Sequence, residues 1–246
     1  MGSDDLQIWL NHFEYHAQHP RLVPACLSDR LTPEEQRLIA SSIASFQLGE
    51  QSEGATLQRA AERFGREHGQ PSLARIVALF IREEQRHASL LRAFMEDHGI
   101  ARKRHDWTDR VFRVARRLAG FELYLHVLIC AELIGKVYYR ALEAATGCQR
   151  LKVLCRTLVC EELAHVGFES QLLLALRAAR PAPLRGLMRL AHRAFFVGTA
   201  SVVWMTHRPV LRCVGYEARS FLRSCLAQYA FYLEPPAAAL AHPSAR

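Results

Sequence analysis

The chain has 246 residues, half of them hydrophobic, so it can bury a substantial core in one large domain or two small ones. Its longest strongly apolar run, residues 194–205, contains Gly and Thr and is too short to span a bilayer. The acidic N-terminus lacks the layout of a signal peptide, and the seven cysteines show no CxxC spacing, which favours reduced thiols. We therefore expect a cytoplasmic protein with no membrane partner.

The formal net charge of +8 raises the question of a nucleic-acid partner. The arginines are spread over all the expected helices, with one denser run at Arg110, Arg113, Arg116 and Arg117. This distribution favours solvated helix faces over a surface for nucleic acid.

Periodic apolar stretches separated by Pro and Gly predict an all-α protein. A short amphipathic helix is expected over residues 4–18. At the next helix start, Thr32 is the expected N-cap, Pro33 follows it, and Glu35 completes a capping box. Four long helices are expected over residues 32–68, 72–98, 109–146 and 148–180. Two more are expected over residues 184–206 and 209–232, separated at Pro209.

This order of elements predicts four parts in the chain. Residues 1–31 form an N-terminal helix and loop, and residues 32–181 form a four-helix bundle. Residues 182–233 form a C-terminal helical pair that packs on the bundle, and residues 234–246 form a disordered tail.

Potential metal ligands lie on the apolar stripe of each long helix. The second and fourth helices each carry a Glu-x-x-His pair, whose members share one helix face and can point into the same space. The first and third helices each place one further glutamate on the stripe. The six side chains are Glu50, Glu84, His87, Glu132, Glu162 and His165.

Four carboxylates that meet in one core would repel each other, and burying them without partners is costly. Two divalent cations would balance the four negative charges, with the two imidazoles as neutral ligands. The sequence therefore predicts a two-metal carboxylate site. The alternative is a set of surface or ion-paired side chains that happen to lie near the stripes.

This arrangement resembles the ferritin-like superfamily of di-iron carboxylate proteins, such as ferritins, rubrerythrins and di-iron oxygenases. The resemblance covers residues 32–180 and implies an antiparallel four-helix bundle, here with a short N-terminal helix and two additional C-terminal helices. It implies Glu50 and Glu132 as the single-helix ligands, and the two Glu-x-x-His pairs as the remaining ligands. The implied cofactor is two Fe ions, with Mn or a mixed Mn/Fe pair as alternatives.

Three further side chains on the same stripes bear on the site. Glu53, one turn after Glu50, is a candidate additional metal ligand, with a hydrogen-bonding role or replacement of Glu50 as alternatives. Glu169, one turn beyond His165, would cap a polar channel or meet a basic residue of the C-terminal helices. Tyr139, two turns after Glu132, is expected to pack in the core, with a redox or pocket role as the alternative.

Two acidic residues directly precede the ligand glutamates. Glu83 and Glu161 are expected to lie off the stripes and to pair with arginines such as Arg82 or Arg86. The alternative is that they form hydrogen bonds to the metal ligands.

The expected activity follows from this site and its surroundings. Small residues crowd the ligand positions, which favours open volume for dioxygen and an organic molecule, although close helix packing explains them equally well. The leading hypothesis is an oxidoreductase that uses two Fe ions and dioxygen to hydroxylate, N-oxygenate or desaturate a small organic substrate. Because no cysteine module is present, electrons would come from an external donor, and the C-terminal helices could form a homodimer surface.

Two alternative functions remain open at this point. One is a ferroxidase or a peroxide-scavenging protein of the rubrerythrin or Mn-catalase type. The other is a non-catalytic helical protein whose metals only stabilise the bundle.

Overall fold

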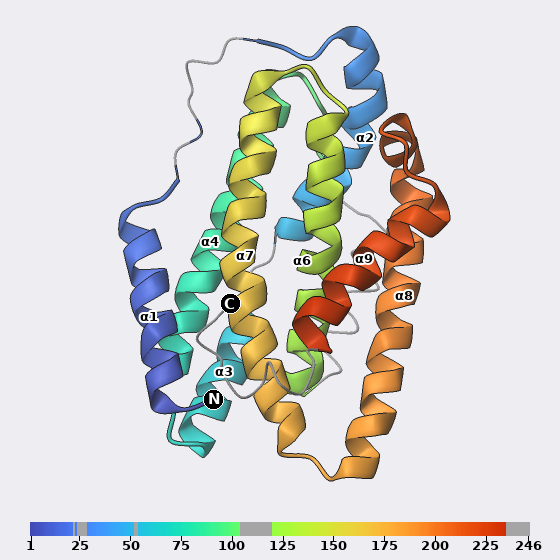
Figure 1. Cartoon of the computed structure of the whole chain (residues 1–246). Helices are drawn as coiled ribbons and strands as arrows, with labels where there is room; N and C mark the ends of the chain where they lie inside the picture. Colours follow the sequence, from blue (N-terminus) through green and yellow to red (C-terminus); the bar gives the residue numbers. More distant parts are fainter. Residues whose placement is uncertain (22, 24–28, 52–53, 104–119, 235–246) are drawn as a thin grey trace.

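The computed structural model describes the chain except residues 22, 24–28, 52–53, 104–119 and 235–246, and every regular element in the described part is a helix (Figure 1). The helices are α1 (Ser3–Gln18), α2 (Pro33–Glu50), α3 (Ala55–Glu67), α4 (Ser72–Asp97), α6 (Phe121–Ala144), α7 (Gln149–Ala178), α8 (Ala182–Cys213) and α9 (Ala218–Leu233).

Helices α2, α4, α6 and α7 form a four-helix bundle, with α3 following α2 along the bundle (Figure 1). Neighbouring helices run antiparallel, while α4 ends and α6 begins at opposite ends of the bundle. These helix directions are those of four-helix bundles with one long crossover. The predicted all-α, antiparallel four-helix bundle is confirmed.

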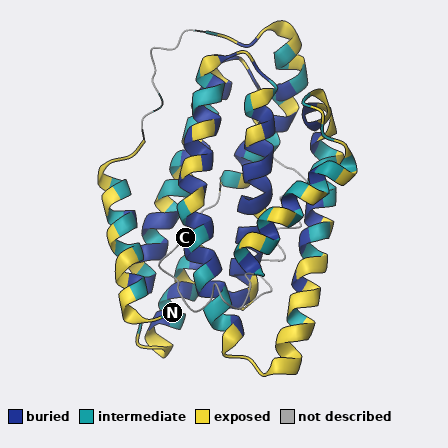
Figure 2. Ribbon diagram, viewed as in Figure 1, coloured by how far each residue is buried: buried dark blue, intermediate teal, exposed yellow. Residues whose placement is uncertain are grey.

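The additional helices cover two opposite sides of the bundle. Helix α1 packs along α4, whereas α8 and α9 pack against α6 (Figure 1). Helix α6 is consequently buried on almost all sides, while α8 keeps a broad exposed face (Figure 2). Among the described helices, none combines the length and the apolar character needed to cross a membrane.

The expected N-cap at Thr32 is present in the structure. The Glu35 amide donates to Thr32 Oγ1 at 3.2 Å, and the Thr32 amide donates to Glu35 Oε2 at 2.8 Å. This capping box satisfies two donors that a helix start would otherwise leave unpaired.

The prediction of a single helix over residues 32–68 is wrong, because two helices occupy that range. Helix α2 ends at Glu50 and α3 begins after Gly54, whose φ of 66° lies in the left-handed region. A Cβ at Gly54 would collide with the Ile81 side chain of α4, so both the backbone angle and the close approach require glycine. The break places Glu50 at a helix end instead of mid-helix.

The expected separation of two helices at Pro209 is also wrong, since α8 continues through Pro209 to Cys213. Val210 and Leu211, which follow the proline, are fully buried in the core. Their burial offsets the hydrogen bond that proline cannot donate. The helix ends instead near Gly215, which has a φ of 85°.

Some expected features lie outside the described residues. They are Glu53, the start of the helix expected at 109, the arginine run at 110–117, and the tail from 235 onward. The third long helix begins at Phe121 and not at residue 109, because the backbone of Gly120 before it is extended.

Candidate metal centre

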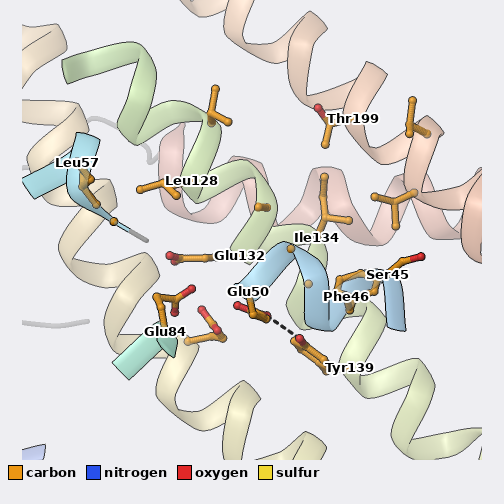
Figure 3. Close-up of a pocket in the computed structure, with 18 of the residues that line it drawn as sticks. Ser45, Phe46, Glu50, Leu57, Glu84, Leu128, Glu132, Ile134, Tyr139 and Thr199 are labelled. Atoms are coloured by element: carbon orange, nitrogen blue, oxygen red, sulfur yellow. Dashed lines mark hydrogen bonds between the residues drawn. The ribbon is translucent and has the colours of Figure 1, made fainter. Parts of the chain in front are cut away.

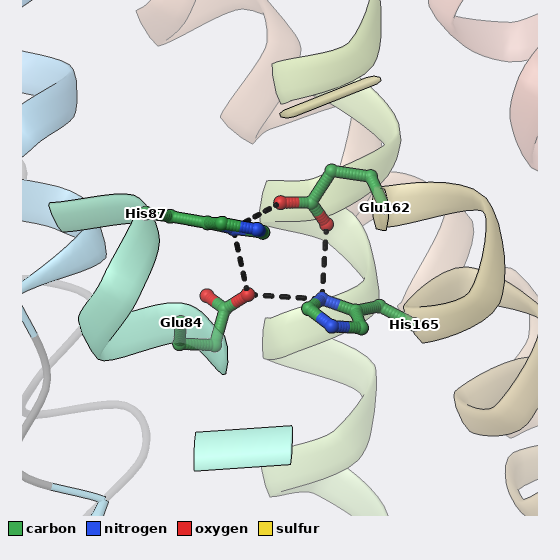
Figure 4. Close-up of side chains that lie close together, drawn as sticks. All are labelled: Glu84, His87, Glu162 and His165. Atoms are coloured by element: carbon green, nitrogen blue, oxygen red, sulfur yellow. Dashed lines mark ion pairs between the residues drawn. The ribbon is translucent and has the colours of Figure 1, made fainter. Parts of the chain in front are cut away.

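The two Glu-x-x-His pairs face each other across α4 and α7 (Figure 4). Ligand atoms of Glu84, His87, Glu162 and His165 all lie within 4.8 Å of one another. His87 Nδ1 lies 3.2 Å from a Glu162 oxygen, and His165 Nδ1 lies 2.9 Å from a Glu84 oxygen. Each histidine also lies 3.4 Å from the glutamate of its own helix. Each glutamate therefore lies between the two imidazoles, where a bridging carboxylate would be placed.

The other nitrogen of each histidine contacts a carboxylate from the opposite helix. His87 Nε2 lies 2.8 Å from Glu161, and His165 Nε2 lies 3.2 Å from Glu83. When Nε2 donates its proton to such a carboxylate, Nδ1 keeps a lone pair directed into the cluster. The structure thus orients both imidazoles for metal binding through Nδ1.

The arginine pairing expected for Glu83 and Glu161 accounts for only part of their contacts. Arg86 forms a close ion pair with Glu161 and lies 4.0 Å from Glu83. Both carboxylates also bind a histidine, and Glu161 is buried, with 1% of its surface exposed. The alternative role, a hydrogen bond to a candidate metal ligand, therefore describes both residues.

Glu50 and Glu132 approach the cluster from α2 and α6 (Figure 3). Burial and the charges of Glu84 and Glu162 raise the pKa of Glu50 well above its usual range, while nearby His87 opposes this rise. Burial and the charges of Glu169 and Glu162 raise the pKa of Glu132 in the same way, opposed by His165. Glu50 is thus near enough to His87, and Glu132 to His165, for their charges to act on one another.

The cluster contains buried polar atoms that lack a hydrogen-bond partner among the described residues. They are one oxygen each of Glu84 and Glu162, both oxygens of Glu132, and Nδ1 of His87 and of His165. Such atoms are rare in native proteins unless a ligand or water satisfies them. Carboxylate oxygens and imidazole nitrogens suit Fe and Mn ions, so the donor set fits a two-metal centre.

The charges of the metal-free cluster are balanced by protons. Burial lowers the pKa of His87, but its hydrogen bond to Glu161 and the nearby carboxylates of Glu162 and Glu84 raise that pKa well above the usual range. The pKa of His165 is raised in the same way, because the carboxylates of Glu162, Glu83 and Glu84 surround its imidazole. Metal ions would displace these protons on binding.

A cavity of about 150 Å³ adjoins the four glutamates (Figure 3). Glu50, Glu84, Glu132 and Glu162 line one side, whereas most of the wall is apolar. Helix α8 closes the opposite side with the residues Thr199, Val202, Val203, Thr206 and His207.

Small residues near the candidate ligands have two different roles. Gly49, Gly54, Ala131 and Gly135 line the cavity, which agrees with the open volume expected from the sequence. Gly167 differs, because a Cβ there would lie 2.9 Å from the Trp9 ring of α1. At that position the alternative explanation, close helix packing, is correct.

Tyr139 and Glu169 both lie beside the cluster, and Glu53 falls outside the described residues. The Tyr139 hydroxyl donates to Glu50 Oε1 at 2.6 Å and lines the cavity. Glu169, 1% exposed, faces Glu132, and among the described residues neither of its oxygens has a hydrogen-bond partner.

Helix α1 contributes contacts to the site that the sequence analysis did not anticipate. Phe13 of α1 is buried, and its ring stacks 5.9 Å from that of His165. Phe80 of α4 lies 4.6 Å from the same imidazole. These rings shield His165 on the α1 side of the bundle. The apolar stripe of α1 was visible in the sequence, but its docking partner was not.

The sequence of this chain matches no family model and no curated protein. Its fold is similar to two solved structures of R2-like ligand-binding oxidase variants. The variant with an aerobically reconstituted Mn/Fe cofactor has a TM-score of 0.62 and 16% sequence identity, with 92% of each chain covered. The variant with an anaerobically reconstituted Mn/Fe cofactor has a TM-score of 0.61 and 17% identity, again with 92% of each chain covered. The chain therefore has the ferritin-like helical fold that these oxidases share.

Proposed function

We propose that this protein is a di-metal oxidase that uses dioxygen to oxidise a small, mainly apolar organic substrate. The observation that carries the proposal is the apolar cavity that ends on four clustered carboxylates. The resemblance in fold to oxidases with a Mn/Fe cofactor supports the same class of chemistry. The proposed cofactor is two Fe ions or a mixed Mn/Fe pair.

The proposed ligand arrangement follows from the two sides of the cluster. Glu50 and His87 would hold one metal ion, and Glu132 and His165 would hold the other. Glu84 and Glu162, which each contact both imidazoles, would bridge the pair. When bound, the metal pair would supply the electrons that reduce dioxygen and the oxidising power for the substrate.

The protein would prepare this chemistry through three kinds of contact. Glu161 and Glu83 hold the two imidazoles in place, and Tyr139 directs a hydrogen bond to Glu50. The apolar walls keep bulk water away from the carboxylates, which strengthens their electrostatic interactions. The hydroxyls of Thr199 and Thr206 offer polar contacts to a substrate at the far side of the cavity.

The cavity favours this proposal over the two alternatives. A bundle that its metals only hold together has no need for a cavity beside them, and empty core volume destabilises a fold. A ferroxidase must admit hydrated iron ions, for which a mainly apolar wall is a poor entry path. A bound organic molecule would bury the apolar wall and favour the loaded state.

The test is anaerobic reconstitution with Fe(II), alone and together with Mn(II), followed by elemental analysis and exposure to dioxygen. We expect two metals per chain and a metal-dependent consumption of dioxygen. Glu162→Ala should lose the pair, whereas Glu122→Gln should keep it, because Glu122 lies on α6 at 3.2 Å from Arg180 and outside the cluster. Absence of stoichiometric metal in the unmodified protein would refute the proposal.

A further inference from the structure

Glu169 lies on α7 one turn beyond His165 and two turns beyond Glu162, so the three side chains share one helix face. We propose that Glu169 is a seventh protein ligand of the metal centre and binds the ion on the His165 side together with Glu132. This inference rests on the proposed function, because it assigns one more ligand to the same pair of metals.

The surroundings of Glu169 place it in the His165 half of the cluster. Its side chain meets that of Glu132 on α6, and its charge acts on His165, Glu84 and Glu162. Glu169 is 1% exposed and Glu132 is 8% exposed. Among the described residues, none of their four carboxylate oxygens has a hydrogen-bond partner. Two buried carboxylates thus face each other without a donor between them.

The buried cations on the same two helices form their hydrogen bonds elsewhere, although the charge of Lys136 acts on Glu132 and Glu162. Lys136, one turn beyond Glu132 on α6, donates to the Tyr232 hydroxyl at 3.2 Å and lies 4.6 Å from the centre of that ring. Arg177, two turns beyond Glu169 on α7, contacts the ring nitrogens of His126 and His192 at 3.2 and 2.6 Å. Neither Lys136 nor Arg177 forms a hydrogen bond to Glu169.

A buried, facing pair of carboxylates needs a cation or a shared proton between its members. Burial is the main reason that the pKa of Glu169 is raised well above its usual range, with further contributions from Glu84 and Glu162. A metal ion next to His165 would supply the missing positive charge to Glu132 and Glu169 together. Such an ion would balance the charge of both carboxylates.

The additional ligand makes the two metal positions unequal. The His165 side would hold Glu132, Glu169 and His165, besides the two bridging glutamates. The His87 side would hold Glu50 and His87, and Glu50 already accepts a hydrogen bond from Tyr139. Five carboxylates exceed the charge of two divalent ions by one, so the His165 side favours the ion that more readily reaches a higher oxidation state.

The experiment compares Mn(II) binding by the full-length protein and by Glu169→Gln, which keeps the side-chain shape but removes the charge. Equilibrium dialysis under anaerobic conditions and EPR of unbound Mn(II) give the affinity of each position. We expect Glu169→Gln to weaken one of the two positions at least about tenfold and to leave the other unchanged. Glu122→Gln is the matched control, a buried glutamate with an arginine partner, and it should bind like the unmodified protein.

Anomalous diffraction from Mn(II)-loaded crystals then separates a ligand from a nearby charge, and it should show Glu169 bonded to the ion next to His165. Two Mn(II) positions of unchanged affinity in Glu169→Gln, or a loaded structure in which Glu169 touches no ion, would overturn the inference alone. Failure of the unmodified protein to bind Mn(II) or Fe(II) would overturn both the inference and the proposed function. Thermal unfolding of the metal-free variants provides the folding control, and both variants should unfold cooperatively, as the unmodified protein does.

Discussion

The hydroxyl of Tyr139 on α6 donates a 2.6 Å hydrogen bond to Glu50, the last residue of α2. Because α2 ends at this residue, the position of Glu50 depends on contacts with other helices more than on its own helix. Tyr139 is therefore the side chain that orients the candidate ligand on the His87 side of the centre. The ring of Tyr139 is itself fixed, since it is 1% exposed and packs 5.5 Å from Phe46.

Replacement of Tyr139 by Phe should weaken the binding of one metal ion while the protein stays folded. The loss of a hydrogen bond that orients a ligand lowers metal affinity by about 10–100-fold in known sites. Metal titration with a competing chelator measures the change. Tyr138→Phe is the matched control, because its hydroxyl contacts Ser42 at 2.7 Å and does not contact Glu50. Equal effects of the two substitutions would contradict the role of Tyr139.

Replacement of Glu161 by Gln should also lower metal affinity by about 10–100-fold, because the carboxylate orients His87 through Nε2. Glu83→Gln should affect the other position in the same way through His165. Competition titrations on the single variants and on the double variant test this. Because each residue orients a different imidazole, the two single variants should lower the affinity of different metal positions. The double variant should lower the affinity of both. Unchanged affinity in both single variants would show that the imidazoles are oriented by other contacts.

The stability of the metal-free protein should fall as the pH rises. Folding raises the pKa values of His87, His165, Glu50 and Glu132, so the folded state binds more protons than the unfolded state. For such groups the free energy of unfolding decreases with rising pH until the folded pKa is passed. Glu84 acts in the opposite sense, since its contacts with the imidazoles of His165 and His87 outweigh burial and lower its pKa, but this effect is confined to acidic pH below its usual pKa.

Thermal unfolding in the presence of a chelator checks this prediction between about pH 6 and about pH 9. The metal-free protein should unfold at a lower temperature at the alkaline end. The affinity of the protein for metals should instead increase with rising pH, because the protons that compete with the metals are removed. An unfolding temperature that rises with pH in the metal-free protein would contradict the protonation described for the cluster.

Replacement of Ala131 by Phe should fill part of the cavity without removing a candidate ligand. Ala131 lines the cavity beside Glu132, and its side chain is exposed to that space. We expect two metals per chain as before, together with weaker binding of an apolar fluorescent probe and of any substrate. Leu123→Phe, at an exposed position of the same helix, is the control. Unchanged probe binding in Ala131→Phe would place the organic molecule elsewhere.

The spacing of the ligand residues could be derived from the sequence because it is a property of single helices. Residues three or four apart share a helix face, so Glu84 with His87 and Glu162 with His165 had to project together wherever those helices packed. The capping box at Thr32 is similarly local, since it involves residues within one turn. These features together with the apolar stripes predicted the bundle and the clustered side chains.

Contacts between helices were decided only by the tertiary structure. The crossed pairing of His87 with Glu161 and of His165 with Glu83 depends on the relative height of α4 and α7, which no spacing within one helix determines. The break before Gly54 and the continuation through Pro209 depend on the approach of Ile81 and on the burial of residues after the proline. Local propensity predicted the opposite in both places. The structure differs because packing between neighbouring helices outweighs the local cost of ending a helix before Gly54 and of keeping Pro209 inside one.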